Sequence, residues 1–176
     1  MRKFNLIILL LSIITISCNS SDDSGIEEQS GFLRIGEVEF ELANGISEDY
    51  SDDSINEVYN IDLTFLSSEF TIDGKDYTGN GEGIYFEIYS PTPNKLSTGI
   101  YEYNQTGTSL SFDDATVFYK DSDGENLEKG INSGTITVTK SENDYYELTF
   151  ECVDELSRTI TGRYNGNVNY ILEPKE

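Results

Sequence analysis

Two tyrosines and a glutamate on one predicted strand are the residues whose types and spacing best suit ligand binding. Tyr85, Glu87 and Tyr89 alternate with apolar residues between positions 84 and 88, so in a strand their side chains point away from the apolar face. A tyrosine ring offers a flat apolar surface to a sugar or peptide, and the carboxylate accepts hydrogen bonds. The pattern is equally typical of cross-strand aromatic packing, or of a face covered by a loop or a second layer. Both interpretations are open.

A second group of residues suits a divalent cation. Four carboxylates lie close together in the sequence: Asp121, Asp123, Glu125 and Glu128. Hard oxygen ligands of this kind bind Ca²⁺, but the spacing does not complete an EF-hand loop, because Tyr119 and Gly130 occupy its first and last ligand positions. The stretch also fits a solvated hairpin loop with Asp-Gly as its turn. We therefore expect no cofactor, with Ca²⁺ at these four residues as the alternative.

The composition removes several classes of enzyme. The chain has no histidine, which excludes Ser-His-Asp and Cys-His nucleophiles, His-ligated zinc and the commonest general base at neutral pH. Carboxylate pairs of the glycosidase type remain chemically possible, although 33 acidic residues produce such pairs by chance. Cys152 alternates with apolar residues and is predicted to be a small buried side chain. The sequence predicts a protein that is not an enzyme, with a carboxylate-only hydrolase as the less favoured alternative.

The first residues have the pattern of an export signal. Two positive charges precede the apolar run Phe4–Ile16, which has secretory length and is short for a membrane span. The following "TISC" resembles the lipobox of bacterial lipoproteins, although Thr15 stands where leucine is usual. The resemblance implies that residues 1–17 are removed and that Cys18 receives a diacylglycerol anchor. An ordinary secretory signal with an incidental cysteine is the alternative.

The polar continuation carries a second resemblance. "NSSDDS", after the cysteine, is similar to the Ser/Asp-rich export tag of surface lipoproteins of the Bacteroidota type. That resemblance implies attachment to the outer membrane with display on the cell surface, and the periplasmic face is the alternative. Residues 18–30 show no periodic apolar pattern, so they are predicted to form a flexible acidic tether.

The charge of the chain limits its partners. With 33 acidic and 11 basic residues, the formal net charge is −22. Nucleic-acid binding depends on neutralising phosphates with lysine and arginine, and anionic headgroups attract basic segments. We therefore expect no nucleic acid, and contact with the membrane through the lipid anchor alone.

The rest of the chain alternates apolar and polar residues with period two, which indicates antiparallel strands with one wet face. We expect residues 31–176 to form a single all-β domain, a sandwich or small barrel of about nine or ten strands. "LSTGIYEY" and "ITGRYNGNVNY" resemble strands in the compact β domain of small surface lipoproteins of the same bacterial group. The resemblance implies no catalytic residue.

These expectations combine into one functional hypothesis. The sequence predicts an outer-membrane-anchored lipoprotein whose β-rich domain binds a glycan, peptide or protein without catalysis. A structural role as an accessory subunit of an outer-membrane complex is the alternative.

Overall fold

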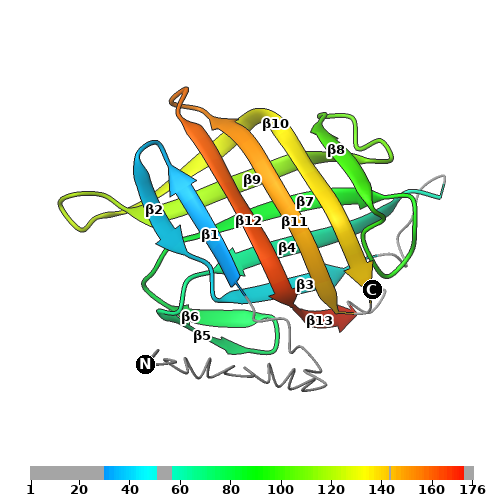
Figure 1. The fold of residues 1–176 in the computed structure, drawn as a ribbon, viewed down its shortest axis with the longest axis horizontal. Helices are drawn as coiled ribbons and strands as arrows, with labels where there is room; N and C mark the ends of the chain where they lie inside the picture. Colours follow the sequence, from blue (N-terminus) through cyan, green and yellow to red (C-terminus); the bar gives the residue numbers. More distant parts are fainter. Residues whose placement is uncertain (1–29, 51–56, 143, 173–176) are drawn as a thin grey trace, which may run out of the picture.

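The computed structural model describes residues 30–50, 57–142 and 144–172, and within these ranges it contains strands and no helix (Figure 1). The strands are β1 (Ser30–Ile35), β2 (Val38–Glu41), β3 (Asn44–Asp49), β4 (Tyr59–Leu66), β5 (Phe70–Asp73), β6 (Asp76–Gly79), β7 (Gly83–Ser90), β8 (Gly99–Tyr103), β9 (Ser111–Lys120), β10 (Asn126–Glu142), β11 (Tyr145–Asp154), β12 (Thr159–Asn167) and β13 (Asn169–Leu172). The predicted all-β class is confirmed.

Eleven of these strands form one curled sheet in the order β13-β3-β4-β7-β9-β8-β10-β11-β12-β1-β2. All neighbouring strands are antiparallel except β13 with β3 and β8 with β9. The sheet folds over itself, so that β12, β11 and β10 cross in front of β3, β4 and β7 (Figure 1). The result is an open half-barrel made from one mixed sheet. It has more strands than the predicted nine or ten, and it is not a pair of separate antiparallel sheets.

The core lies between the two layers because the inward side chain of every second residue is apolar. The alternating apolar residues are buried on three strands: Ile61, Leu63 and Phe65 of β4; Ile84, Phe86 and Ile88 of β7; Tyr146, Leu148, Phe150 and Cys152 of β11. Burial from water is the main stabilising contribution of such side chains. It also raises the pKa of the Cys152 thiol to about 12, which agrees with its predicted role as a buried apolar residue.

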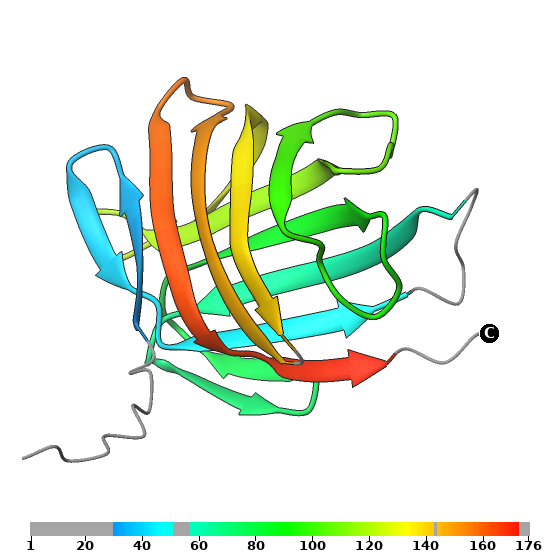
Figure 2. The same ribbon diagram turned by 45° about the vertical axis from the view of Figure 1, so that its right-hand side comes forward.

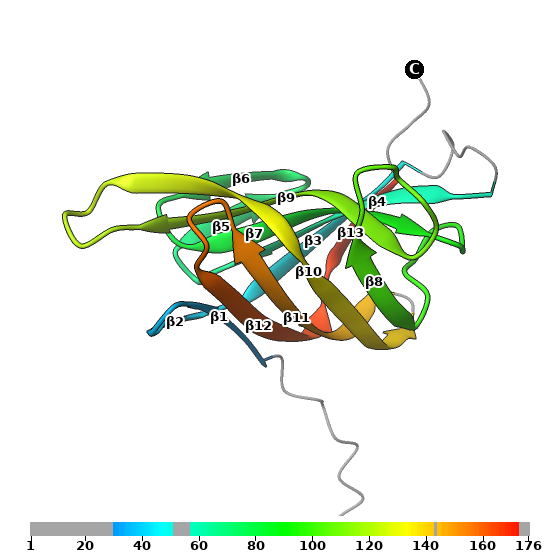
Figure 3. The ribbon, with the colours of Figure 1, turned by 90° about the horizontal axis from the view of Figure 1, so that it is seen from above.

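The β9–β10 hairpin forms an arm that extends beyond the rest of the sheet (Figure 3). Its turn is closed by Asp121, whose Oδ1 accepts hydrogen bonds from the amides of Asp123 (2.9 Å) and Glu125 (3.0 Å). β10 pairs with β9 at its start and with β8 and β11 further on. This long strand therefore passes from the rear layer to the front one.

The two-stranded hairpin β5–β6 is separate from the large sheet. It lies behind the rear layer, on the outer side of β4, β7 and β9 (Figure 3). Aromatic contacts fix it there, since Phe70 of β5 meets Phe118 of β9 edge-on with ring centroids 6.0 Å apart. The hairpin therefore covers part of the rear layer's outer face.

The predicted signal segment 1–17, the lipid attachment point Cys18 and the tether up to residue 29 lie outside the described residues. Within the described ranges, no helix has the length and apolar character that crossing a bilayer requires.

Candidate functional site

The outer face of β7 carries the three residues that the sequence singles out. Tyr85, Glu87 and Tyr89 are all half-buried, and they alternate with fully buried core residues. The Tyr85 hydroxyl donates to Asp62 Oδ2 of the neighbouring strand β4 at 2.8 Å. The Tyr89 hydroxyl lies within hydrogen-bonding distance of Glu87 Oε1 (2.9 Å) and of Asp113 Oδ2 (3.1 Å). Their outward orientation is as predicted, but both hydroxyls are engaged by carboxylates of the protein itself.

A loop also covers one of the two rings. Gly107, with φ of +58°, would place a Cβ 3.2 Å from Tyr89 Cζ, so the loop between β8 and β9 packs directly on that ring. Burial and the adjoining carboxylates raise the pKa values of Tyr85 and Tyr89 above the ordinary tyrosine value. The two tyrosines and their carboxylate partners therefore form one hydrogen-bonded surface. We call this surface the carboxylate network and define it by Asp62, Tyr85, Glu87, Tyr89 and Asp113.

The strand register places a row of carboxylates across this network. Glu48 lies opposite Asp62, Asp62 opposite Glu87, and Glu87 opposite Asp114, on the adjacent strands β3, β4, β7 and β9. Like charges directly opposite each other destabilise a sheet. Burial is the largest cause that raises the pKa of Asp62 to about 7, and the neighbouring carboxylates add to it. Asp62 therefore holds a proton far more readily than an exposed aspartate does.

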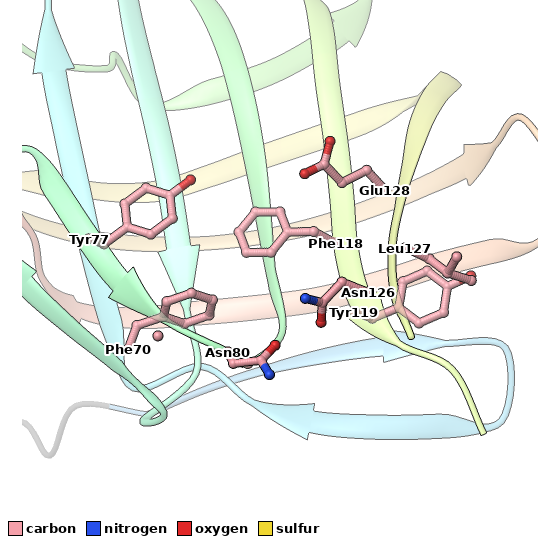
Figure 4. A pocket seen from close by; sticks show the side chains of 10 residues that line it. Phe70, Tyr77, Asn80, Phe118, Tyr119, Asn126, Leu127 and Glu128 are labelled. Atoms are coloured by element: carbon pink, nitrogen blue, oxygen red, sulfur yellow. The ribbon is translucent and has the colours of Figure 1, made fainter. Parts of the chain in front are cut away.

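A cleft lies beside this network, between the β5–β6 hairpin and the β9–β10 arm (Figure 4). Its volume is about 180 Å³. Tyr77 of β6 and Phe118 of β9 have nearly parallel rings, with centroids 6.4 Å apart and planes 9° apart. Phe70 meets the Tyr77 ring edge-on at 5.5 Å. Tyr77 is 41% exposed, so its ring borders the cleft and remains accessible.

Polar side chains complete the lining of this aromatic cleft, which we define by Phe70, Tyr77, Phe118, Asn80, Asn126 and Glu128. Glu128 lies opposite Phe118 in the β9–β10 pair. The ammonium group of Lys120 donates to the Asn80 carbonyl oxygen at 2.5 Å, which joins the arm to the chain after the hairpin. Burial is the largest cause that raises the pKa of the Tyr77 hydroxyl, and the charges of Glu128 and Glu48 raise it further. That hydroxyl therefore stays protonated and able to donate.

A glycine allows Phe118 to lie against the sheet. Gly83 is opposite Phe118 in the β7–β9 pair, and a Cβ at Gly83 would be 2.4 Å from Phe118 Cζ and 2.6 Å from the Phe65 carbonyl oxygen. Real Cβ atoms do not approach that closely, so the ring occupies the space that any side chain here would need.

The four residues of the predicted Ca²⁺ cluster are divided between two places. Asp121, Asp123 and Glu125 belong to the turn of the arm, where an Asp121 oxygen already accepts two backbone amides. Glu128 lies further along β10 and lines the aromatic cleft. Among the described residues, no three acidic or cysteine side chains come together as a metal group would require. The Asp-Gly turn of the alternative interpretation is present, with Gly124 at φ +82°.

The hairpin that carries Phe70 and Tyr77 is hard to recognise from the sequence, because the stretch from Ile72 to Gly83 is rich in glycine, aspartate and asparagine, which are typical of connectors. The signal was present in "FTIDGKDYT", where two short alternating segments flank an Asp-Gly turn. Comparison with models of protein families, with curated proteins and with solved structures finds nothing that matches this chain.

Proposed function

We propose that the protein is a lipid-anchored surface lipoprotein whose β domain binds a glycan at the aromatic cleft, without catalysis and without a cofactor. The observation that carries this proposal is the pair of near-parallel rings of Tyr77 and Phe118 beside Asn80, Asn126 and Glu128. Flat aromatic rings stack on the C–H face of a sugar, and amide and carboxylate groups bind its hydroxyls. The cleft has room for only one or two sugar rings, so the rest of a longer glycan would lie outside it.

The charge of the domain narrows the class of glycan. The full chain has a formal charge of −22 and Glu128 lines the cleft itself, so the site repels uronic acids and sulfated sugars. Neutral hexoses, or amino sugars with a free ammonium group, complement this site. A peptide or protein is the other class of ligand that the sequence allows. No arrangement comparable to these rings and amides favours a peptide or protein at this cleft.

A binding screen with a matched variant tests the proposal. The mature domain is applied to an array of neutral, amino and acidic oligosaccharides, and affinities for the positive members are measured by calorimetry. Tyr77→Ala is expected to weaken binding at least about tenfold, equivalent to roughly 1.4 kcal/mol. Tyr145→Ala, which removes a half-buried tyrosine from β11 in the front layer, is the control and should leave affinity unchanged. Equal affinity of the two variants would contradict the cleft as the site.

The location is proposed on the resemblance of the N-terminal segment and needs a separate experiment. Cys18→Ser removes the thiol that would carry the lipid. A diacylated cysteine supplies two acyl chains, which is enough for stable anchoring. We expect the variant to leave the membrane fraction, whereas retention there would refute the lipid anchor. Protease shaving of intact cells then distinguishes the cell surface from the periplasmic face.

A carboxylate-only hydrolase is the second candidate, and one observation favours it. Asp62, with a pKa of about 7, could donate a proton, and the carboxyl group of Glu87 lies directly opposite it in the register. Glycoside hydrolysis uses a pair of carboxyl groups, one of which donates a proton to the leaving group. Release of nitrophenol from a panel of aryl glycosides, abolished by Asp62→Asn, would establish it. No release from any member would leave binding as the function.

A further inference from the structure

The strand β2 ends the eleven-stranded sheet, and one of its edges has no partner. It pairs with β1 from Val38 to Glu41, and no other strand of the described residues pairs with it. Figure 1 shows β2 at the margin of the sheet, beside the base of the arm. An unpaired edge presents backbone N–H and C=O groups that another chain can bind by adding a strand.

An apolar pocket of about 570 Å³ lies between this strand and the arm. Ile35, Val38 and Phe40 line it from β1 and β2, and Tyr119 and Leu127 line it from the arm. The charged residues Lys120, Asp121 and Arg158 also belong to its lining. Val38 is 55% exposed, although its position in the alternation belongs to the inward face of the sheet. Exposed apolar surface beside a free edge is the feature that edge strands normally avoid. The pocket is therefore suited to apolar side chains from a strand added at β2.

The opposite side of the same strand is acidic. Glu39 and Glu41 alternate with Val38 and Phe40 on β2, and Glu37 lies in the preceding turn. All three glutamates are exposed. Two copies of β2 would bring glutamates against glutamates, which disfavours pairing of the chain with itself. Lysine or arginine on an added strand would instead face opposite charge. Arg34 of β1 already makes this kind of contact, at 2.5 Å from Glu39 Oε2.

We propose that β2 is a docking edge for a basic segment of another protein, which adds one antiparallel or parallel strand to the sheet. Alternate residues of that segment are apolar and enter the pocket beside Val38. The residues between them are lysine or arginine and lie next to Glu37, Glu39 and Glu41. Backbone hydrogen bonds supply the affinity, and the alternation supplies the specificity. The pocket shares Tyr119 and Leu127 with the aromatic cleft, but no residue of β2 lines the cleft, so docking at β2 does not depend on glycan binding.

Three synthetic peptides test the proposal against simple charge attraction by an acidic protein. The first is a capped heptapeptide of lysine and valine in strict alternation. The second has the same composition with all lysines before all valines, and the third replaces lysine by glutamate. We expect the alternating lysine peptide to bind at least about tenfold more tightly than either of the others. It should also protect the amides of residues 37–41 from hydrogen exchange. Equal binding of the two lysine peptides, or protection elsewhere, would overturn the proposal.

Matched variants locate the contact. Val38→Asp places a charge at the pocket and should weaken the alternating peptide about tenfold or more. Val153→Asp alters a valine of β11 that is 37% exposed and does not line the pocket, so it should have no effect. The double variant Glu37→Lys with Glu41→Lys should transfer the preference to the glutamate peptide, whereas Glu147→Lys with Glu151→Lys on β11 should not. Identical behaviour within either pair, or dimerisation that Val38→Asp abolishes, would refute docking of a basic strand at β2.

Discussion

The aromatic cleft and the carboxylate network lie on the same outer face of the rear layer, and both contain tyrosines beside carboxylates. In the network, the Tyr85 and Tyr89 hydroxyls are bound by carboxylates of neighbouring strands, and the loop at Gly107 packs on the Tyr89 ring. In the cleft, the Tyr77 ring is 41% exposed. The hydroxyl of Tyr77 makes no hydrogen bond to any residue that the structure describes.

The difference follows from how the side chains are positioned and covered. Tyr85 and Tyr89 project from a central strand and lie across their neighbours, where carboxylates of β4 and β9 reach them. Tyr77 projects from a hairpin whose Phe70 and Tyr77 rings contact Phe118 of the sheet. The Tyr77 ring therefore lies at the edge of the sheet's outer face. Tyrosines of the network hence stabilise the fold, whereas Tyr77 is available to a ligand. Four changes can break or sharpen this contrast.

The largest effect is expected from the buried carboxyl of the network. The pKa of Asp62 is raised from 3.8 to about 7 in the folded protein, so the folded state binds the extra proton between these values. Stability therefore falls as the pH rises from about 4 to 7, by about 3 kcal/mol. Asp62→Asn removes this loss and should be more stable than the parent above pH 7. Urea unfolding at several pH values measures it.

Repulsion within the whole acidic domain also changes with pH, so the comparison is made against a second variant. Asp114→Asn removes an exposed carboxylate from the end of the same row and should retain most of the parent's loss of stability with pH. A parent and an Asp62→Asn variant with the same pH dependence would contradict the assigned role of Asp62.

The next effect concerns the support of the cleft. Gly83→Ala would force a Cβ to within 2.4 Å of the Phe118 ring and 2.6 Å of a backbone oxygen, so we expect a loss of about 2 kcal/mol in unfolding free energy. Gly130→Ala, on β10, meets nothing closer than 3.9 Å and should change stability by less than about 0.5 kcal/mol. Thermal melting of both variants decides, and equal midpoints would refute the close approach.

Removing single hydroxyl groups compares the two regions directly. Tyr89→Phe takes a donor away from the half-buried Glu87 and Asp113, which should cost about 1 kcal/mol of stability. Tyr77→Phe should cost less than about 0.3 kcal/mol, because that hydroxyl has no partner among the described residues. Chemical denaturation of both variants at pH 7 measures the contrast. A larger loss for Tyr77→Phe would reverse the roles given to the two regions.

The smallest effect is expected at the acidic turn of the arm. Asp121 Oδ1 accepts two backbone amides, and among the described residues no three acidic side chains come together at this turn, so we expect no cation to bind here. Melting midpoints in EDTA and in millimolar Ca²⁺ should differ by less than about 1 °C, since only a ligand that binds the folded state raises the midpoint. A clear rise with Ca²⁺, lost in Asp123→Asn, would instead establish a calcium site at this turn.

The sequence predicted the strands whose inward side chains meet a complete core. On β7 and β11 the alternation is regular because each strand has one buried and one outer face, whereas on β4 the four residues from Leu63 to Leu66 are all buried. The β5–β6 hairpin gives a weaker signal, because its alternating segments are short and neither of its strands has a fully buried residue. Val38 alternates with Glu37 and Glu39 in the sequence, which is the pattern of an inward-facing residue, and its exposure at 55% reflects the missing neighbour at the end of the sheet.

The two surfaces could be predicted only in part. The outward direction of Tyr85, Glu87 and Tyr89 follows from the period of a single strand. The row from Glu48 to Asp114 depends on which strands are neighbours and on their register. The cleft depends on a hairpin folding back over a distant strand. The local alternation of apolar and polar residues shows neither which strands are neighbours nor how the hairpin folds back. The row of carboxylates and the rings of the cleft are therefore visible only in the three-dimensional structure.

The last strand of the described residues, β13, pairs with the early strand β3. β13 runs parallel to β3, with Asn169 beside Ile46, and Figure 2 shows this red strand alongside the cyan one. A pairing between residues so distant in sequence raises the contact order, which slows folding. The rear layer is therefore complete only when β13 has paired with β3. Without β13, this edge of β3 would have no partner and would be open to aggregation.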